Sequence, residues 1–374
     1  MSFYPICEEL SRAPLDERFD AVTGEDVRRA LGKSSCSPED FLTLMSPAAK
    51  PFLEEMARQA SEITLRQFGR TIQMFTPLYL SNYCTNHCVY CGFNCKNQIN
   101  RSQLSLEQVE VEGKAIAATG MKQLLILTGD ARAKASPEYL EDCVKVLRRH
   151  FPSVSIEIYA MDQDEYDRLV KVGVDGMTMF QETYDEELYA TLHPRGPKRD
   201  FRNRLDAPER GCRAGMRVVN IGALLGLGDW RRDAFITAMH ASYLMRKYPE
   251  TDIAVSLPRM RPHVGEYQPA TIVSDSDMVQ FLMALRIFMP RLGVTISTRE
   301  APEFRENIMP LGVTRMSAGV STAVGGYSDE AETSGQFDIA DERSVDEVCS
   351  MIKAHGFQPV FKDWEPIIPV EGAA

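Results

Sequence analysis

The sequence has no long apolar run. No stretch approaches the roughly 18 apolar residues that a membrane-spanning helix needs. Its amino terminus, MSFYPICEELSRAPLDERFD, is acidic and lacks the basic and then apolar segment of a secretion signal. We therefore expect a cytoplasmic protein that does not enter a membrane.

Positive charge is in deficit, and paired cysteines are not evident. The chain has 42 Lys and Arg against 53 Asp and Glu, for a net charge of -11. This balance disfavours a general nucleic-acid surface and favours partners that meet the protein through local patches. Nine cysteines are an odd number, which suits a disulfide framework poorly. In a reducing compartment such cysteines are more often buried, catalytic or metal-bound.

The chain is long enough to bury a large core. With 374 residues and 44% hydrophobic content, it suits one barrel or two smaller domains. Internal repeats and low-complexity tracts are not evident. The first seventy or so residues lack strand-like runs, and helices are predicted at 24–32, 38–44 and 47–68. We interpret this part, residues 1–72, as a helical extension.

From residue 74 onward, short β-rich runs alternate with helical patterns. The predicted strands are 74–80, 122–128, 154–160, 175–180, 217–224, 252–257, 294–298 and 313–317. The predicted helices between them include 105–119, 136–149, 162–172, 230–247 and 274–289, many opened by a Ser or Asp that can cap free N–H groups. Eight such runs favour a (βα)8 TIM-type barrel over residues 73–356, although a doubly wound open sheet would show the same alternation. Residues 357–374, with spaced prolines, are expected to form an irregular closing segment.

Three cysteines stand together directly after the first predicted strand. In SNYCTNHCVYCGFNCKN, Cys84, Cys88 and Cys91 have C-x3-C-x2-C spacing. A structural zinc site wants four ligands, and a 4Fe-4S cluster usually takes four thiolates, one on each iron. Three thiolates would leave one iron open to chelate the amino and carboxylate groups of S-adenosylmethionine. Reduction of the bound sulfonium would then give a 5'-deoxyadenosyl radical.

Other interpretations of the cysteine loop stay open at this point. The three cysteines could bind zinc, but a second Cys or His pair at ligand spacing is not evident. His87 is interpreted as a surface residue. We expect Cys95 not to be a fourth ligand, because a saturated cluster could not bind the nucleoside.

The cysteine spacing, with Tyr90 before the last cysteine, resembles the signature of the radical S-adenosylmethionine superfamily. The resemblance extends over nearly the whole chain to the 2-iminoacetate synthases, the tyrosine lyases of thiamine biosynthesis. It rests on PLYLSNYCTNHCVYCGF, LLILTGD, FQETY, IGALLGLGDW, SLPRMRP, STRE and FKDW, in that order. The glycines Gly222, Gly226 and Gly228 do not make a phosphate-binding fingerprint and are expected to allow a tight turn against the nucleoside.

The resemblance implies a role for individual residues. Tyr90 and the backbone of Phe93 would hold the adenine. The methionine amino group would be met by Thr128, Gly129 and Asp130. Glu182 would contact the ribose or that amino group, and Arg204 would pair with the methionine carboxylate. Arg299 would hold the tyrosine carboxylate by a two-pronged bond, and Ser317 would lie near the tyrosine amine. Arg259 and Arg261 are further pocket candidates. The family usually has Glu where this chain has Asp130, which leaves the reach of this shorter side chain open.

Purely structural roles compete with these functional ones. Glu182 could cap a helix, because Thr183 and Asp185 follow it at a strand-to-helix turn. Arg299 could pair with Glu300 or Glu303 on the surface. Ser317 could be a buried hydroxyl bonded to backbone.

The implied reaction is cleavage of the Cα–Cβ bond of L-tyrosine. The deoxyadenosyl radical would remove a hydrogen from the amino group, and the products would be 2-iminoacetate (dehydroglycine) for thiazole formation and p-cresol. The hydrogenase-maturation tyrosine lyase is the nearest rival, but after residue 212 this chain has only Cys349, too few thiols for a second cluster. A tryptophan lyase or another radical lyase is a wider alternative, and a zinc-stabilised scaffold is the non-enzymatic one.

Partners follow from one basic stretch and from the resemblance. Between residues 195 and 217 lie Lys198, Arg199, Arg202, Arg204, Arg210 and Arg213. This stretch is either a solvated helix face or a docking surface for an acidic electron donor such as a flavodoxin or ferredoxin. The resemblance also implies a complex with the thiazole synthase.

Overall fold

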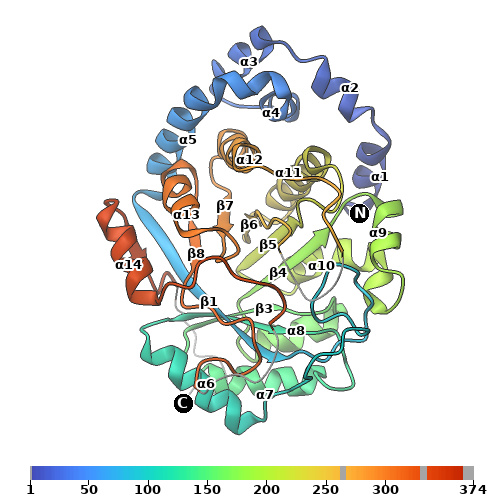
Figure 1. Ribbon diagram of the computed structural model, residues 1–374, viewed down its shortest axis with the longest axis vertical. Coiled ribbons are helices and arrows are strands. Elements are labelled where there is room, and N and C mark those ends of the chain that lie inside the picture. Colours follow the sequence, from blue (N-terminus) through green and yellow to red (C-terminus); the bar gives the residue numbers. More distant parts are fainter. Residues whose placement is uncertain (1, 262–266, 329–334, 365–374) are drawn as a thin grey trace.

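The fold is a closed barrel of parallel strands surrounded by helices (Figure 1). The computed structural model describes residues 2–261, 267–328 and 335–364. The barrel strands are β1 (Thr71–Ser81), β2 (Gln123–Thr128), β3 (Ser153–Glu157), β4 (Gly176–Glu182), β5 (Val218–Ala223), β6 (Asp252–Ser256), β7 (Gly293–Ile296) and β8 (Arg315–Ser317). They pair in sequence order, and β8 and β2 both pair with β1, which closes the ring. The prediction of a (βα)8 barrel is confirmed.

Each strand alternates between the interior and the helical layer, as the two-residue repeat of a strand requires. Leu125 and Leu127 of β2 and Glu157 of β3 line the interior cavity. Leu124 and Ile126 are almost fully buried in the core. In a barrel of this kind, the loops that follow the carboxyl ends of the strands converge over the interior, where chemistry takes place.

The helices that cover the barrel mostly begin where a capping residue was predicted. They are α6 (Leu106–Ala118), α7 (Pro137–Leu147), α8 (Gln163–Lys171), α9 (Glu186–Leu192), α10 (Phe201–Arg213), α11 (Trp230–Lys247), α12 (Asp275–Phe288), α13 (Pro302–Ile308) and α14 (Val345–Ala354). The side chains of Ser105, Ser136 and Ser274 accept hydrogen bonds from backbone N–H groups in the first turns of α6, α7 and α12. These contacts satisfy donors that a helix start would otherwise leave unpaired.

The amino-terminal helices form an arc over α11 and α12 (Figure 1). They are α1 (Tyr4–Arg12), α2 (Leu15–Asp20), α3 (Gly24–Leu31), α4 (Pro38–Met45) and α5 (Leu53–Phe68). The helix predicted over 47–68 is interrupted: 47–52 form the 3-10 helix η1, which contains Pro51, before α5 begins. Proline lacks the N–H that an α-helix interior needs.

The closing segment contains one element that the sequence did not predict. Strand β9 (Gln358–Val360) pairs in parallel with Thr71–Gln73 at the start of β1. Residues 365–374 of this segment lie outside the described residues. No helix in the described ranges combines the length and the apolar character that crossing a membrane requires.

Candidate active site

The cysteine loop between β1 and α6 is fastened to two neighbouring loops. The backbone N–H of Thr85 donates to the carbonyl oxygen of Asp130 at 2.8 Å. On the other side, the N–H groups of His87 and Val89 donate to the carbonyl oxygens of Arg195 and Leu192, at 2.9 and 3.1 Å. The loop is therefore held at the carboxyl ends of the strands by backbone bonds to the segments that follow β2 and β4.

The three thiols share one environment. Burial, with a smaller contribution from the charge of a Cys91 thiolate, raises the pKa of Cys84 to about 11. Burial also raises the pKa of Cys88, and Cys91 and Cys84 both add to this rise. Cys95, in contrast, is exposed. Iron would lower these pKa values, because the thiolate is the form that binds metal.

The described residues do not gather three His, Cys, Asp or Glu side chains around a single metal ion. A 4Fe-4S cluster holds each thiolate on a separate iron, so its ligands stand wider apart than those of one ion. Three neighbouring thiols on one loop, with Cys88 buried and Cys84 and Cys91 half-buried, fit that wider arrangement.

The segment after β2 lies directly against the cysteine loop. A Cβ atom on Gly129 would overlap the carbonyl oxygen of Tyr83 and come within 3.1 Å of Cys84 Cβ. The Asp130 carboxylate accepts a hydrogen bond from Asn86 Nδ2 at 2.7 Å. The hydroxyl of Thr128 is buried and has no hydrogen-bond partner within the described residues. A polar group left in this state is a candidate to meet a ligand.

Glu182 ends β4 in a backbone conformation that only a well-supported residue can keep. Its φ is +73°, and it is the only non-glycine residue in the described ranges with a positive φ. The register of β4 against β5 shifts between Phe180 and Glu182. On α11, Asp233 accepts hydrogen bonds from Thr183 Oγ1 and Tyr184 N at 3.0 and 2.8 Å, which fixes the turn that follows. Such strain is typical of functional positions.

Two basic side chains surround the Glu182 carboxylate. Its Oε1 atom lies 2.6 Å from Lys198 Nζ and 3.4 Å from an Arg204 guanidinium nitrogen. Burial alone would raise the pKa of Glu182, but the charges of Lys198 and Arg204 outweigh it and lower that pKa. Glu182 is therefore a buried carboxylate that stays ionised. Its side chain forms ion pairs, so the helix-capping alternative does not describe its main contacts.

Asp130 and Arg204 both line a small cleft beside the cysteine loop. The cleft is lined by Asp130, Arg132, Tyr159, Ala160, Pro197, Lys198, Asp200, Asn203 and Arg204. Opposite charges on its two sides suit a ligand that carries an ammonium and a carboxylate group, such as the methionine part of S-adenosylmethionine. With the three thiols and the Thr128 hydroxyl, the residues present fit a 4Fe-4S cluster and this nucleoside.

Tyr90 is held in place by a buried histidine. The hydroxyl of Tyr90 lies 2.7 Å from His193 Nε2, and His193 Nδ1 lies 2.8 Å from the carbonyl oxygen of Tyr189. Burial lowers the pKa of His193 to about 3, so the ring is neutral. Nδ1 then carries the proton that the carbonyl needs, and Nε2 accepts from Tyr90. Phe93 packs edge-on against Tyr79 at 5.8 Å between ring centroids.

The barrel interior holds a cavity that opens at the carboxyl ends of the strands. Arg299 and Ser317 both line it, together with apolar side chains from β1 and β2. The Arg299 guanidinium lies 3.4 Å from the centroid of the Phe337 ring. Among the described residues no carboxylate forms an ion pair with it. The hydroxyl of Ser317 accepts a hydrogen bond from Thr298 N at 3.1 Å, and a hydroxyl can still donate to a ligand.

Comparison with known proteins agrees with this architecture. Residues 78–238 match the radical SAM superfamily, and residues 256–358 match the biotin and thiamin synthesis associated domain. The chain is 39% identical to the 2-iminoacetate synthases of Salmonella typhimurium and Escherichia coli, over 93% of this chain and 93% of each relative. The protein belongs to the 2-iminoacetate synthase family of radical S-adenosylmethionine enzymes. Such enzymes use a 4Fe-4S cluster and S-adenosylmethionine.

A solved structure has the same fold as this member of the 2-iminoacetate synthase family. The FeFe-hydrogenase maturase HydG from Carboxydothermus hydrogenoformans superposes with a TM-score of 0.84 at 31% identity, over 96% of this chain and 83% of that one. The likeness covers the barrel and the amino-terminal helices together.

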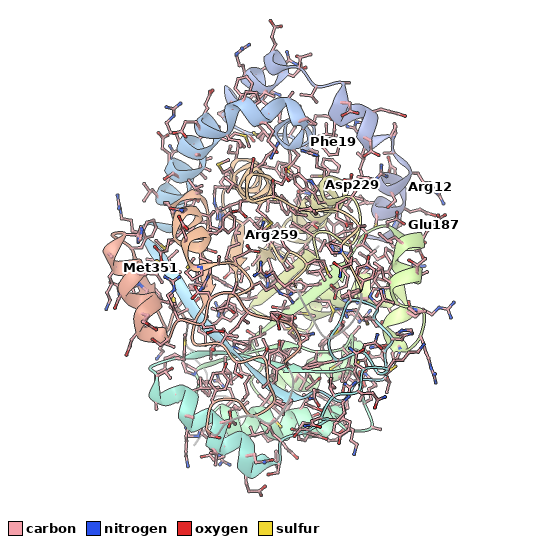
Figure 2. All side chains as sticks on the ribbon, in the orientation of Figure 1. Arg12, Phe19, Glu187, Asp229, Arg259 and Met351 are labelled. Atoms are coloured by element: carbon pink, nitrogen blue, oxygen red, sulfur yellow. The ribbon has the colours of Figure 1, made fainter. Side chains whose placement is uncertain are left out.

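The alternative in which Arg299 pairs with Glu300 on the surface is wrong. Glu300 is buried and pairs with Arg259 instead, whose Nε lies 3.0 Å from Glu300 Oε1. Figure 2 shows Arg259 near the middle of the molecule, whereas Arg12 and Glu187 lie at its edge. Because Arg259 also pairs with Asp275, it serves to fasten the loop after β6 and does not line the interior cavity.

The basic stretch is only partly a surface. Lys198 and Arg204 point inward to Glu182, and Arg210 donates to the carbonyl oxygens of Met161 and Asn203. The exposed members are Arg195, Arg199, Arg202 and Arg213. The docking patch predicted from the sequence therefore contains fewer exposed basic residues than the sequence count suggests.

Several residues of the site were not found from the sequence. They are Glu157, His193, Asp233 and Gln336, together with the role of Lys198 as the partner of Glu182. Glu157 carried one signal that could have been used: a charged residue at the inward position of an otherwise apolar strand. The others act through contacts between residues far apart in the chain, which no local pattern shows.

Proposed function

We propose that this protein cleaves the Cα–Cβ bond of L-tyrosine to give 2-iminoacetate and p-cresol, which would supply thiazole formation in thiamine biosynthesis. The observation that carries the proposal is the interior cavity, which Arg299 and Ser317 both line and in which the Arg299 guanidinium forms no ion pair with any described carboxylate. Arg299 suits a substrate carboxylate because its planar fork matches the two oxygens.

We assign the cofactor residues the roles expected from the sequence. Cys84, Cys88 and Cys91 would hold the cluster, and bound S-adenosylmethionine supplies the radical that starts the reaction. Tyr90 and the backbone of Phe93 would hold the adenine, and Thr128, Gly129 and Asp130 the methionine amino group. Glu182 would contact the ribose or that amino group, and Arg204 the methionine carboxylate. The cleft lined by Asp130 and Arg204 supports this arrangement.

The residues of the cavity would orient the substrate and keep water out. Holding the tyrosine carboxylate on Arg299 selects which hydrogen faces the reacting centre. Burial lowers the pKa of Arg299, and the Phe337 ring stacked on its guanidinium shields it from solvent.

Two protein partners are proposed, one from the charge of the surface and one from the chemistry of the product. An acidic flavodoxin or ferredoxin would deliver the electron at the exposed arginines Arg195, Arg199, Arg202 and Arg213. The thiazole synthase would receive the imine, which water would otherwise hydrolyse. Raising the ionic strength should slow turnover with the protein donor and leave turnover with a small chemical reductant unchanged.

The test is anaerobic reconstitution with iron and sulfide, followed by reductant, S-adenosylmethionine and each aromatic amino acid in turn. We expect p-cresol and 5'-deoxyadenosine with tyrosine alone. The indole analogue formed from tryptophan would show a tryptophan lyase instead. Single alanine substitutions of Cys84, Cys88 or Cys91 should abolish the cluster, and Cys95→Ala is the matched control that should retain it.

A further inference from the structure

Glu157 is the one carboxylate among the described side chains that line the interior cavity. It ends β3, in register with Leu127 of β2, and points into the barrel. Arg299 is the one guanidinium in the same lining, and the remaining side chains are apolar or uncharged polar groups. The cavity therefore carries one carboxylate and one guanidinium among uncharged side chains.

These two charged groups do not neutralise each other. Within residues 2–261, 267–328 and 335–364, no ion pair joins Glu157 to Arg299, and no side chain donates a hydrogen bond to the Glu157 carboxylate. Buried charges in proteins are normally paired. A pair of opposite charges that face one cavity without meeting suits a ligand that carries both charges itself, as the zwitterion of an α-amino acid does.

We propose that Glu157 binds the α-ammonium group of the substrate and accepts one proton from it, while Arg299 holds the substrate carboxylate. The inference rests on the proposed function and assigns its general base. One N–H bond breaks, its electron pair stays on nitrogen, and an O–H bond forms on the Glu157 carboxylate. The neutral amine that results is the form from which a hydrogen atom can be removed, since its N–H bond no longer belongs to a cation.

The charges around Glu157 suit this proton transfer. Burial, with a smaller contribution from the charge of Glu182, raises the pKa of Glu157 to about 7, although the charges of Arg299, Arg204 and Lys198 oppose the rise. A base works best when its pKa lies near the operating pH, because it is then both ionised and basic enough to hold the proton. An ordinary exposed glutamate, with a pKa of about 4.3, would be too weak a base for an ammonium group.

The inference also predicts selectivity for amino acids. A tyrosine analogue without the amino group, 3-(4-hydroxyphenyl)propanoate, would leave the Glu157 carboxylate buried without a partner. Sites built to bond a polar substrate group reject analogues that lack it, because the unmatched protein group has lost its water.

The test compares Glu157→Gln with Glu187→Gln in the reconstituted holoenzyme. Glutamine keeps the size of Glu157 but cannot accept the proton. We expect kcat for p-cresol to fall at least about 100-fold, the usual contribution of general base catalysis. Below about pH 7 the wild-type rate should fall as Glu157 takes up a proton, and this acid limb should be absent in Glu157→Gln. Glu187 lies exposed on α9, so its variant should match the wild type.

Binding separates this inference from the proposed function. Equilibrium dialysis should show wild type preferring tyrosine over 3-(4-hydroxyphenyl)propanoate, with the preference lost in Glu157→Gln. If wild type makes no p-cresol but retains this preference, the proposed function fails and the binding role stands. An unchanged acid limb and an unchanged kcat in Glu157→Gln, with normal iron content, would overturn the inference. Cleavage of S-adenosylmethionine without substrate reports that the variant has folded.

Discussion

The side-chain nitrogen of Lys198 lies 2.6 Å from Oε1 of Glu182, and the backbone N–H of the same lysine donates to Asn86 Oδ1 in the cysteine loop at 2.9 Å. Lys198 also lies over the Tyr90 ring, 5.5 Å from its centroid. One residue thus joins the loop of the cluster cysteines to the carboxylate at the end of β4. Loss of the side chain alone should disturb the carboxylate and spare the loop.

Lys198→Met should raise the pKa of Glu182, because it removes the nearest positive charge while burial continues to raise that pKa. If Glu182 binds S-adenosylmethionine as a carboxylate, binding is lost when pH falls through the pKa of Glu182. The variant should lose binding at a higher pH than wild type. Equilibrium dialysis of labelled S-adenosylmethionine from neutral pH to about pH 4 measures this. Lys171→Met, on the exposed face of α8, is the control, and identical curves for both variants would contradict the prediction.

Gly129→Ala should prevent normal cluster assembly. The added methyl group would overlap the Tyr83 carbonyl and press on Cys84 Cβ, so the cysteine loop must move away from β2. Iron and sulfide content after reconstitution should fall well below one cluster per chain. Gly32→Ala is a matched control because its methyl group would come no closer than 3.4 Å to another atom. A full complement of iron in Gly129→Ala would show that the loop adapts.

Gln336→Leu should make the cluster harder to reduce. Gln336 Nε2 lies 3.7 Å from Cys91 Sγ, while its Oε1 accepts a hydrogen bond from Tyr79 at 2.9 Å. Hydrogen bonds to cluster sulfur stabilise the more negative, reduced state, so their loss lowers the reduction potential. A redox titration followed by electron paramagnetic resonance should give a more negative midpoint than wild type. An equal or higher midpoint would remove this role for Gln336.

Arg299→Lys should impair tyrosine cleavage although it keeps the charge. Lysine has no planar fork for two carboxylate oxygens and stacks less well on Phe337. We expect kcat/KM to fall about 10- to 100-fold, mainly through KM, because one of two hydrogen bonds to a charged group is worth about 1.5–3 kcal/mol. Steady-state kinetics of p-cresol formation measure this. Cleavage of S-adenosylmethionine without substrate should not change, and a parallel loss there would indicate damage to the cofactor site.

The strands were predictable from the sequence because they are short apolar runs that must be buried, and each predicted run coincides with a barrel strand. The cysteine loop was predictable because its three thiols are close in the chain. The short strand β9 was missed. Helix α10 contains Pro208 and Gly211, which argue locally against a helix, yet its buried face packs on β4 and β5. Tertiary packing outweighs propensity there.

The partners of the site residues could not be predicted for a different reason. Glu182 and Lys198 are sixteen residues apart, and Tyr90 and His193 are 103 apart, so their contacts exist only after the barrel closes. The sequence placed Arg299 just after the carboxyl end of a strand, but it did not show that Glu300 beside it turns to Arg259. Strand alternation decides which side a residue faces, and only the fold decides what it meets there.

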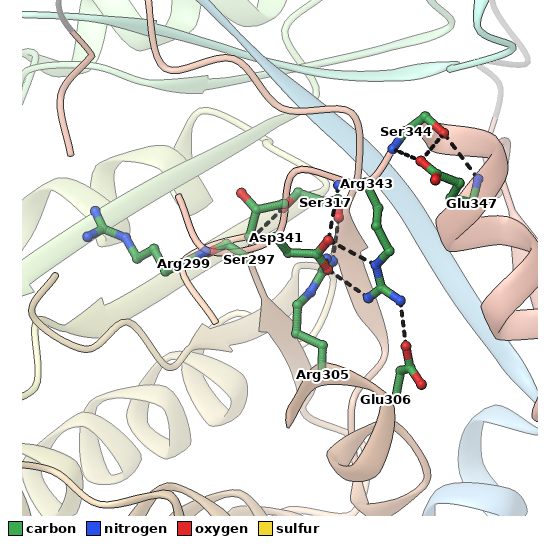
Figure 3. A network of polar contacts seen from close by, with 10 residues as sticks. Ser297, Arg299, Arg305, Glu306, Ser317, Asp341, Arg343, Ser344 and Glu347 are labelled. Atoms are coloured by element: carbon green, nitrogen blue, oxygen red, sulfur yellow. Dashed lines mark hydrogen bonds and ion pairs between the residues drawn. The ribbon is translucent and has the colours of Figure 1, made fainter. Parts of the chain in front are cut away.

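Asp341→Asn should destabilise the protein strongly, because it leaves a buried guanidinium without its carboxylate. Arg305 and Asp341 form an ion pair in which both side chains are fully buried, and Arg305 also donates to the Ser317 carbonyl (Figure 3). Arg299 points away from this network. Removing one partner of a buried pair costs about 3–5 kcal/mol. Urea unfolding of the apoprotein at neutral pH should show this loss.

The stability loss caused by Asp341→Asn should also depend on pH, in a direction that the pKa of Asp341 determines. Burial alone would raise the pKa of Asp341, but the hydrogen bond from Arg343 and the charge of Arg305 outweigh it and lower that pKa. A lowered pKa in the folded state adds stability that is present above the unfolded value of about 3.9 and is lost as pH falls through the folded value. The difference in the free energy of unfolding between wild type and Asp341→Asn should therefore become smaller as the pH falls below about 4. Glu306→Gln, which removes a half-exposed partner of Arg343, should cost only about 0–1 kcal/mol, and an equal cost for both variants would contradict the buried-pair account.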